Sequence, residues 1–108
     1  MKKSDVVKCY KQVREVLLNT FEATETDRQG ELKVNTRYGA LFVNTHEPHN
    51  NGVVCSIFCR FETPELAEIT GCGHTGKMNF HEYNTQALFT QWYKFIQSVY
   101  EPCKQTTH

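Results

Sequence analysis

Hydrophobic positions near the two ends of the chain follow the period of a helix. Apolar residues every three or four positions predict a helix from about Asp5 to Thr20. The same spacing returns after Asn84, whose side chain can cap a helix, and Pro102 ends this second segment. The residues that define the two buried faces are Val6, Tyr10, Val13, Leu17 and Phe21 in the first, and Leu88, Trp92, Phe95, Ile96 and Val99 in the second.

Between these helices the period falls to two, which is typical of strands. Leu32 to Thr36 alternates apolar with polar residues, and a second β-rich segment, Ala40 to Thr45, follows a break at Tyr38 and Gly39. These two segments should therefore form a hairpin. Val53 to Phe61 is apolar on both faces, as expected for a strand inside a sheet.

The remaining segments complete an α+β fold. Thr63, Pro64 and Glu65 begin a short helix that Gly71 stops, and Met78 to His81 form one more short strand. Polar residues 22–30 are expected to form a loop. The predicted order is α-β-β-β-(short α)-β-α, with an antiparallel sheet of three or four strands and both long helices packed on one of its faces.

Composition indicates a single globular domain over residues 1–108. Apolar residues make up 39% and aromatic residues 12%, which is enough for one core. Twelve basic and twelve acidic residues give a net charge of zero, so bulk charge does not favour non-specific nucleic-acid binding. The N-terminus lacks the apolar region of a signal peptide, no apolar run is long enough to span a membrane, and the five cysteines form no CxxC pair. We therefore expect a cytoplasmic protein with reduced thiols.

The segment from Gly71 to His81 is the densest in groups that bind or react. Gly71, Gly76 and Lys77 have the spacing of a phosphate-binding loop, but Met78 stands where that loop needs a hydroxyl for magnesium. No strand precedes the segment. The alternatives are a tight glycine connection and a loop that binds an anion through its amides and Lys77.

Metal binding and nucleophilic catalysis are weaker hypotheses for the same region. The spacings of the histidines and cysteine are loosely compatible with zinc, although no structural-zinc pattern is complete. The candidate ligands are His46, His49, Cys72, His74 and His81. Cys72 could pair with His74 or His81, but no orienting acid or oxyanion hole can be identified. We therefore predict no catalytic residue and no cofactor.

Two kinds of binding surface remain. Arg37-Tyr38 and Arg60-Phe61 are fragments of the basic and aromatic pattern that binds nucleic acids, and Lys77 is a third candidate contact. The second helical segment carries more aromatic residues than one buried face needs, among them Tyr93 and Tyr100. Such a surplus is typical either of a partner surface or of a second helix packed alongside.

The order of several short motifs resembles a family of small accessory proteins of uncharacterised activity from tailed bacteriophages. The motifs are Thr36-x-Tyr38-Gly39, Cys59-Arg60-Phe61-Glu62, the Pro-Glu helix start, and Gly76-Lys77-x-Asn79-Phe80-His81. The resemblance runs from about Leu32 to the last helix. It implies a phage protein made in the host cytoplasm, and it transfers no activity.

The leading hypothesis is a small non-enzymatic phage protein that binds and inhibits a host protein. Because such accessory proteins often disable host defences by binding, a CRISPR–Cas component is one candidate target. The predicted contact residues are His74, Lys77, Asn79, Tyr93 and Tyr100. A nucleic-acid-binding factor using Arg37, Arg60 and Lys77 is the alternative, and a small zinc-dependent protein is the third. A homodimer is also left open.

Overall fold

The computed structural model describes residues 3–45, 55–69 and 77–101. The elements are, in chain order, α1 (Lys3–Thr20), β1 (Thr24–Glu25), β2 (Glu31–Thr36), β3 (Gly39–Asn44), β4 (Cys55–Phe61), α2 (Pro64–Ile69), β5 (Lys77–Glu82) and α3 (Thr85–Val99). This arrangement confirms the predicted α+β class and the order of its main elements.

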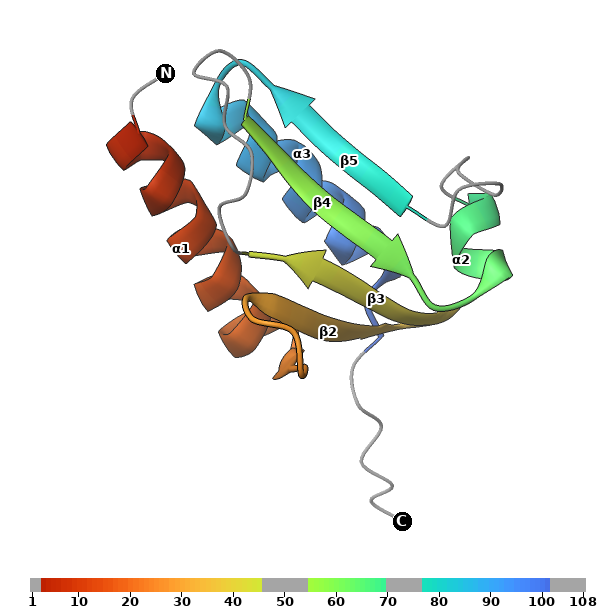
Figure 1. Cartoon of the computed structure of the whole chain (residues 1–108). Helices are drawn as coiled ribbons and strands as arrows, with labels where there is room; N and C mark the ends of the chain where they lie inside the picture. Colours follow the sequence, from red (N-terminus) through yellow and green to blue (C-terminus); the bar gives the residue numbers. More distant parts are fainter. Residues whose placement is uncertain (1–2, 46–54, 70–76, 102–108) are drawn as a thin grey trace.

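The strands form one antiparallel sheet whose spatial order, β1-β2-β3-β4-β5, is also their order along the chain (Figure 1). The predicted hairpin is present, and Thr36 lies opposite Gly39 across its turn. Gly39 has a φ of 123°, and a Cβ at this position would lie 2.5 Å from the Thr63 methyl carbon. Only glycine fits this turn without strain.

The predicted strand count of three or four is wrong, because the described residues form a sheet of five strands. The additional strand, β1, lies in the segment expected to be a loop. It has two residues, Thr24 and Glu25, and both are exposed. A strand this short and polar has no hydrophobic period, so only its backbone pairing with Lys33 and Leu32 of β2 defines it.

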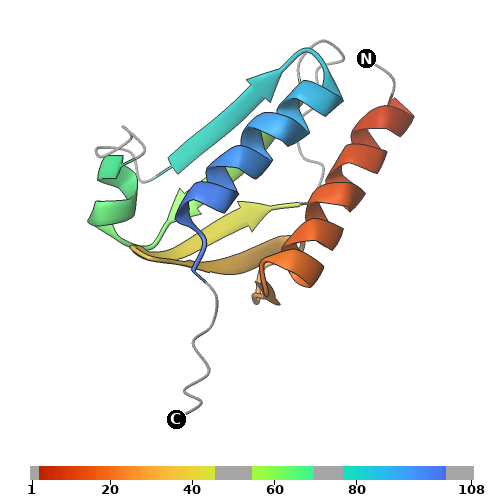
Figure 2. The same ribbon diagram turned by 180° about the vertical axis from the view of Figure 1, so that it is seen from behind.

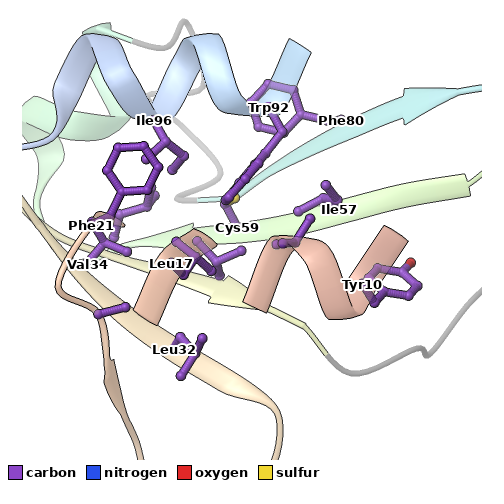
Figure 3. Packing of buried hydrophobic residues seen from close by; sticks show 14 of the residues in the cluster. Tyr10, Leu17, Phe21, Leu32, Val34, Ile57, Cys59, Phe80, Trp92 and Ile96 are labelled. Carbon is purple, nitrogen blue, oxygen red and sulfur yellow. The ribbon is translucent and has the colours of Figure 1, made fainter. Parts of the chain in front are cut away.

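Both long helices pack on the same face of the sheet, as expected (Figures 1 and 2). Alternate residues of β2 to β5 point into this layer and are buried: Leu32, Val34, Leu41, Val43, Ile57, Cys59 and Phe80. They meet the apolar faces of α1 and α3 in one core, with Trp92 and Leu17 fully buried inside it (Figure 3). This packing leaves the opposite face of the sheet without either long helix.

The additional aromatic side chains of α3 and of Tyr100 pack against other parts of the fold. Phe21, just after α1, packs its ring 5.5 Å from that of Tyr93 and 5.0 Å from that of Tyr100. On the other side of α3, the rings of Phe95 and Phe80 are 5.4 Å apart. The segment just after α1 and strand β5 therefore account for these side chains.

Side chains that cap the helices behave as the sequence indicated. The Asn84 side chain accepts hydrogen bonds from the backbone N–H groups of Gln86 and Ala87 at 2.8 and 3.1 Å. Thr63 Oγ1 accepts from the N–H of Leu66, and Pro64 is the first residue of α2. These bonds satisfy donors that the first turn of a helix leaves unpaired.

Candidate binding face of the sheet

The face of the sheet turned away from α1 and α3 carries polar, basic and aromatic side chains; we call it the open face. Figure 1 views the sheet from this side, with both long helices behind it. Because strand side chains alternate between faces, the neighbours of the core residues point here. They are Glu31, Lys33 and Asn35 from β2, Ala40, Phe42 and Asn44 from β3, Ser56, Phe58 and Arg60 from β4, and Lys77 and Asn79 from β5.

Four of these residues form a line across four strands, which we call the cationic row. Lys33 lies opposite Phe42, Phe42 opposite Arg60, and Arg60 opposite Lys77. Adjacent strands are about 4.8 Å apart, so the side chains are direct neighbours. Lys77 is exposed and the other three are partly exposed. Three of the four carry positive charge, and the charge of Arg60 is paired with that of Glu31.

Arg60 is held in one position within the row. Its Nε donates to Glu31 Oε2 at 3.0 Å, and its Nη2 donates to Glu31 Oε1 at 3.1 Å. Its guanidinium also lies 4.0 Å from the centre of the Phe42 ring. A two-bond pair of this kind fixes orientation as well as charge, so Arg60 is a rigid element of the row.

Glu31 is the acid that orients Arg60, and its charge is maintained by its surroundings. Burial alone would raise the pKa of Glu31, but hydrogen bonds from Arg60 and Thr26 and the charges of Arg60 and Arg28 hold it below its ordinary value. The pKa of Arg60 is raised, chiefly by its hydrogen bonds to Glu31. Both groups are therefore ionised at neutral pH.

A second line of side chains lies beside the cationic row. Phe58 is opposite Asn79, and Phe58 is two residues along β4 from Arg60. Asn79 is exposed and Phe58 partly exposed. The open face thus combines positive charge, an aromatic surface and an amide that can donate and accept hydrogen bonds.

The structure brings together only some of the residues that the sequence singled out. Arg60, Lys77 and Asn79 share the open face. Arg37 is at the β2–β3 turn, where its Nη2 donates to the carbonyl oxygen of Ser98 at 3.2 Å, so it lies away from the row.

The two tyrosines predicted to contact a partner lie in the helical layer. Tyr93 and Tyr100 are partly buried against the core around Phe21. The hydroxyl of Tyr100 donates to Glu22 at 2.7 Å. They are therefore separated from Lys77 and Asn79 by the sheet, and their role in partner binding stays a prediction.

The remaining candidates lie outside the described residues. These are His46, His49 and the glycine-rich residues 70–76 with Cys72 and His74. His81 lies in β5, but its side chain is not among those described. Within residues 3–45, 55–69 and 77–101, no three His, Cys, Asp or Glu side chains gather as metal ligands do. The zinc and anion-loop hypotheses stay predictions.

Sequence reasoning missed Lys33, Phe42 and Phe58 as site residues. The first two could have been found, because a two-residue turn in the predicted hairpin places Lys33 opposite Phe42. The pairing of Arg60 with Lys77 could not, because a helix and residues 70–76 separate them along the chain.

Comparison of the chain with protein-family models, curated proteins and solved structures finds no match. The resemblance to phage accessory proteins therefore stays a prediction. No helix in the described part of the chain has both the length and the apolar character needed to cross a membrane.

Proposed function

We propose that this chain is a small non-enzymatic accessory protein that binds and inhibits a protein of the cell in which it is made. The partner docks on the open face of the sheet. The cationic row is the observation that carries this proposal, because it gives the face without the two long helices a definite charge pattern. The expected partner surface is acidic, with apolar groups that meet Phe42 and Phe58.

One feature favours a protein partner over a polyanion. The chain has no net positive charge to attract nucleic acid from a distance. A phage origin and a host defence protein as the target are part of the same proposal, and they rest on the motif resemblance alone.

Affinity capture from bacterial lysate tests this function. Tagged protein is used as bait with and without nuclease, and captured proteins are identified by mass spectrometry. We expect a stoichiometric, nuclease-resistant protein that is lost with the bait K33E/K77E. The matched control is Lys94→Glu, a charge reversal at an exposed position of α3. Equal capture by wild type and K33E/K77E would contradict docking on the open face.

Single-stranded nucleic acid is the second candidate partner, favoured by the aromatic rings of Phe42 and Phe58 beside the cations. Bases stack on exposed rings while cations contact phosphates. Binding of labelled single-stranded DNA and RNA, followed by fluorescence anisotropy, tests this candidate. With two or three phosphate contacts, the slope of log K against log salt should be about −1.4 to −2.1. If neither DNA nor RNA binds at low salt, about 20–50 mM, nucleic-acid binding is refuted as the function.

A further inference from the structure

Strand β5 ends the sheet on one side. In the part of the chain that the structure describes, β5 pairs with β4 alone, and Figure 1 shows it as the outermost strand. Along an antiparallel strand, successive residues point their N–H and C=O groups to opposite sides. About half of the backbone groups of β5 therefore point away from β4, and they form an edge that can pair with another strand.

The two sides of this edge differ in chemistry. On the open face it presents Lys77 and Asn79, both exposed. On the helical face lie the partly exposed Met78 and the buried Phe80, which packs against the partly exposed ring of Phe95. A strand added beside β5 would have every second side chain on each of these sides.

We propose that the edge of β5 receives an extended segment of the partner protein as an added strand. The proposal rests on the function given above and names the form of the bound segment. The residue opposite Lys77 would lie in line with the cationic row, on a strand about 4.8 Å from β5. An acidic side chain fits there because it would pair with Lys77. The neighbouring residues of the segment lie on the side of the partly exposed Met78, so they are apolar.

The bound segment therefore alternates acidic or polar with apolar residues. Backbone hydrogen bonds to β5 supply affinity, and the alternation supplies specificity. A segment with basic residues on the open side meets Lys77 and is disfavoured. This dependence on side chains distinguishes specific strand addition from non-specific pairing of any extended peptide with a sheet edge.

The test uses a capped nine-residue peptide of alternating glutamate and valine as the probe. It is titrated into the ¹⁵N-labelled full chain, and amide chemical shifts are followed by NMR. We expect saturable shifts concentrated in Lys77–Glu82. Lys77→Glu should weaken binding about fivefold or more by charge reversal, whereas Lys94→Glu should leave it unchanged. A peptide with lysine in place of glutamate should bind at least fivefold more weakly than the probe.

Two further peptides test whether the backbone makes the contact. One carries N-methyl groups at its odd positions and the other at its even positions. Only one set of N–H groups faces β5, so one peptide should lose binding and the other should keep it. Equal binding by both, or no shifts in β5 with the unmodified probe, would overturn the proposal.

These peptides require no host protein, so the two proposals fail separately. Capture of a host protein that depends on the open face, together with no peptide binding at β5, would leave the proposed function standing and refute the added strand. Peptide binding at β5 without any captured protein would leave the strand-accepting edge standing and refute the proposed function.

Discussion

The ion pair between Glu31 and Arg60 gives the sharpest stability prediction, because the chain supplies its own exposed control. The Glu31 side chain is 10% exposed and that of Arg60 is 32% exposed. The substitution Glu31→Gln removes the charge that accepts two hydrogen bonds from Arg60 and one from Thr26. It leaves a guanidinium that is only partly able to regain water.

Breaking a fully buried pair costs about 3–5 kcal/mol, and an exposed pair contributes about 1 kcal/mol or less. With one partner buried and the other one-third exposed, we expect Glu31→Gln to lower the free energy of unfolding by about 2 kcal/mol. The control is Glu25→Gln, which breaks the pair of Arg14 and Glu25, whose side chains are 38% and 70% exposed. This change should cost about 0.5 kcal/mol or less.

Urea denaturation of the two variants and the wild type measures the difference. The pH dependence adds a second check. The pKa of Glu31 is lower in the folded protein than in the unfolded chain, so its contribution is complete above the unfolded value of about 4.3. It is lost as pH falls through the folded pKa.

The stability gap between wild type and Glu31→Gln should therefore narrow below about pH 4.5. Equal losses for Glu31→Gln and Glu25→Gln at pH 7 would refute the burial argument. A gap that is constant down to about pH 3 would refute the charge argument.

Three further predictions concern the turn, a helix cap and a buried thiol. Gly39→Ala should destabilise the protein by about 2 kcal/mol or more in thermal unfolding, because alanine is strained at this φ and its Cβ meets Thr63; a neutral effect would contradict the turn geometry. Asn84→Ala should cost about 1 kcal/mol while Asn84→Asp retains the cap, and equal losses in urea denaturation would argue against capping. Burial raises the pKa of the Cys59 thiol and leaves it inaccessible, so peptide mass spectrometry should find it unalkylated by iodoacetamide in the native protein and alkylated in urea.

Elements with a sustained hydrophobic period could be predicted from the sequence. The prediction of which residues share each face of β4 is confirmed for the described side chains, because Ile57 and Cys59 are buried and Arg60 is on the other side. The two-residue strand β1 could not be predicted, since two exposed residues contain no period. Hydrophobic periodicity predicts an element with a buried face. It does not predict a strand such as β1, which is defined by backbone pairing alone.

The candidate site was predictable only in part, because it depends on register across long connections. The glycine-rich loop before them makes Lys77 and Asn79 candidates, yet their surroundings come from β4. The surplus of aromatic residues in α3 makes Tyr93 and Tyr100 candidates. No periodicity within α3 indicates that Phe21, more than seventy residues earlier, takes up both rings.

The order of the strands in the sheet has a consequence for synthesis of the chain. Each strand pairs with its neighbour in sequence, so the sheet can assemble progressively from hairpins as the chain leaves the ribosome. Its apolar face, however, is covered in large part by α3, which follows β1 to β5 in the chain. A nascent or prematurely terminated chain lacking Trp92 and Ile96 would therefore present a paired sheet with an uncovered apolar surface. Such a species is a substrate for chaperones and proteases, which ties the cellular survival of this protein to completion of α3.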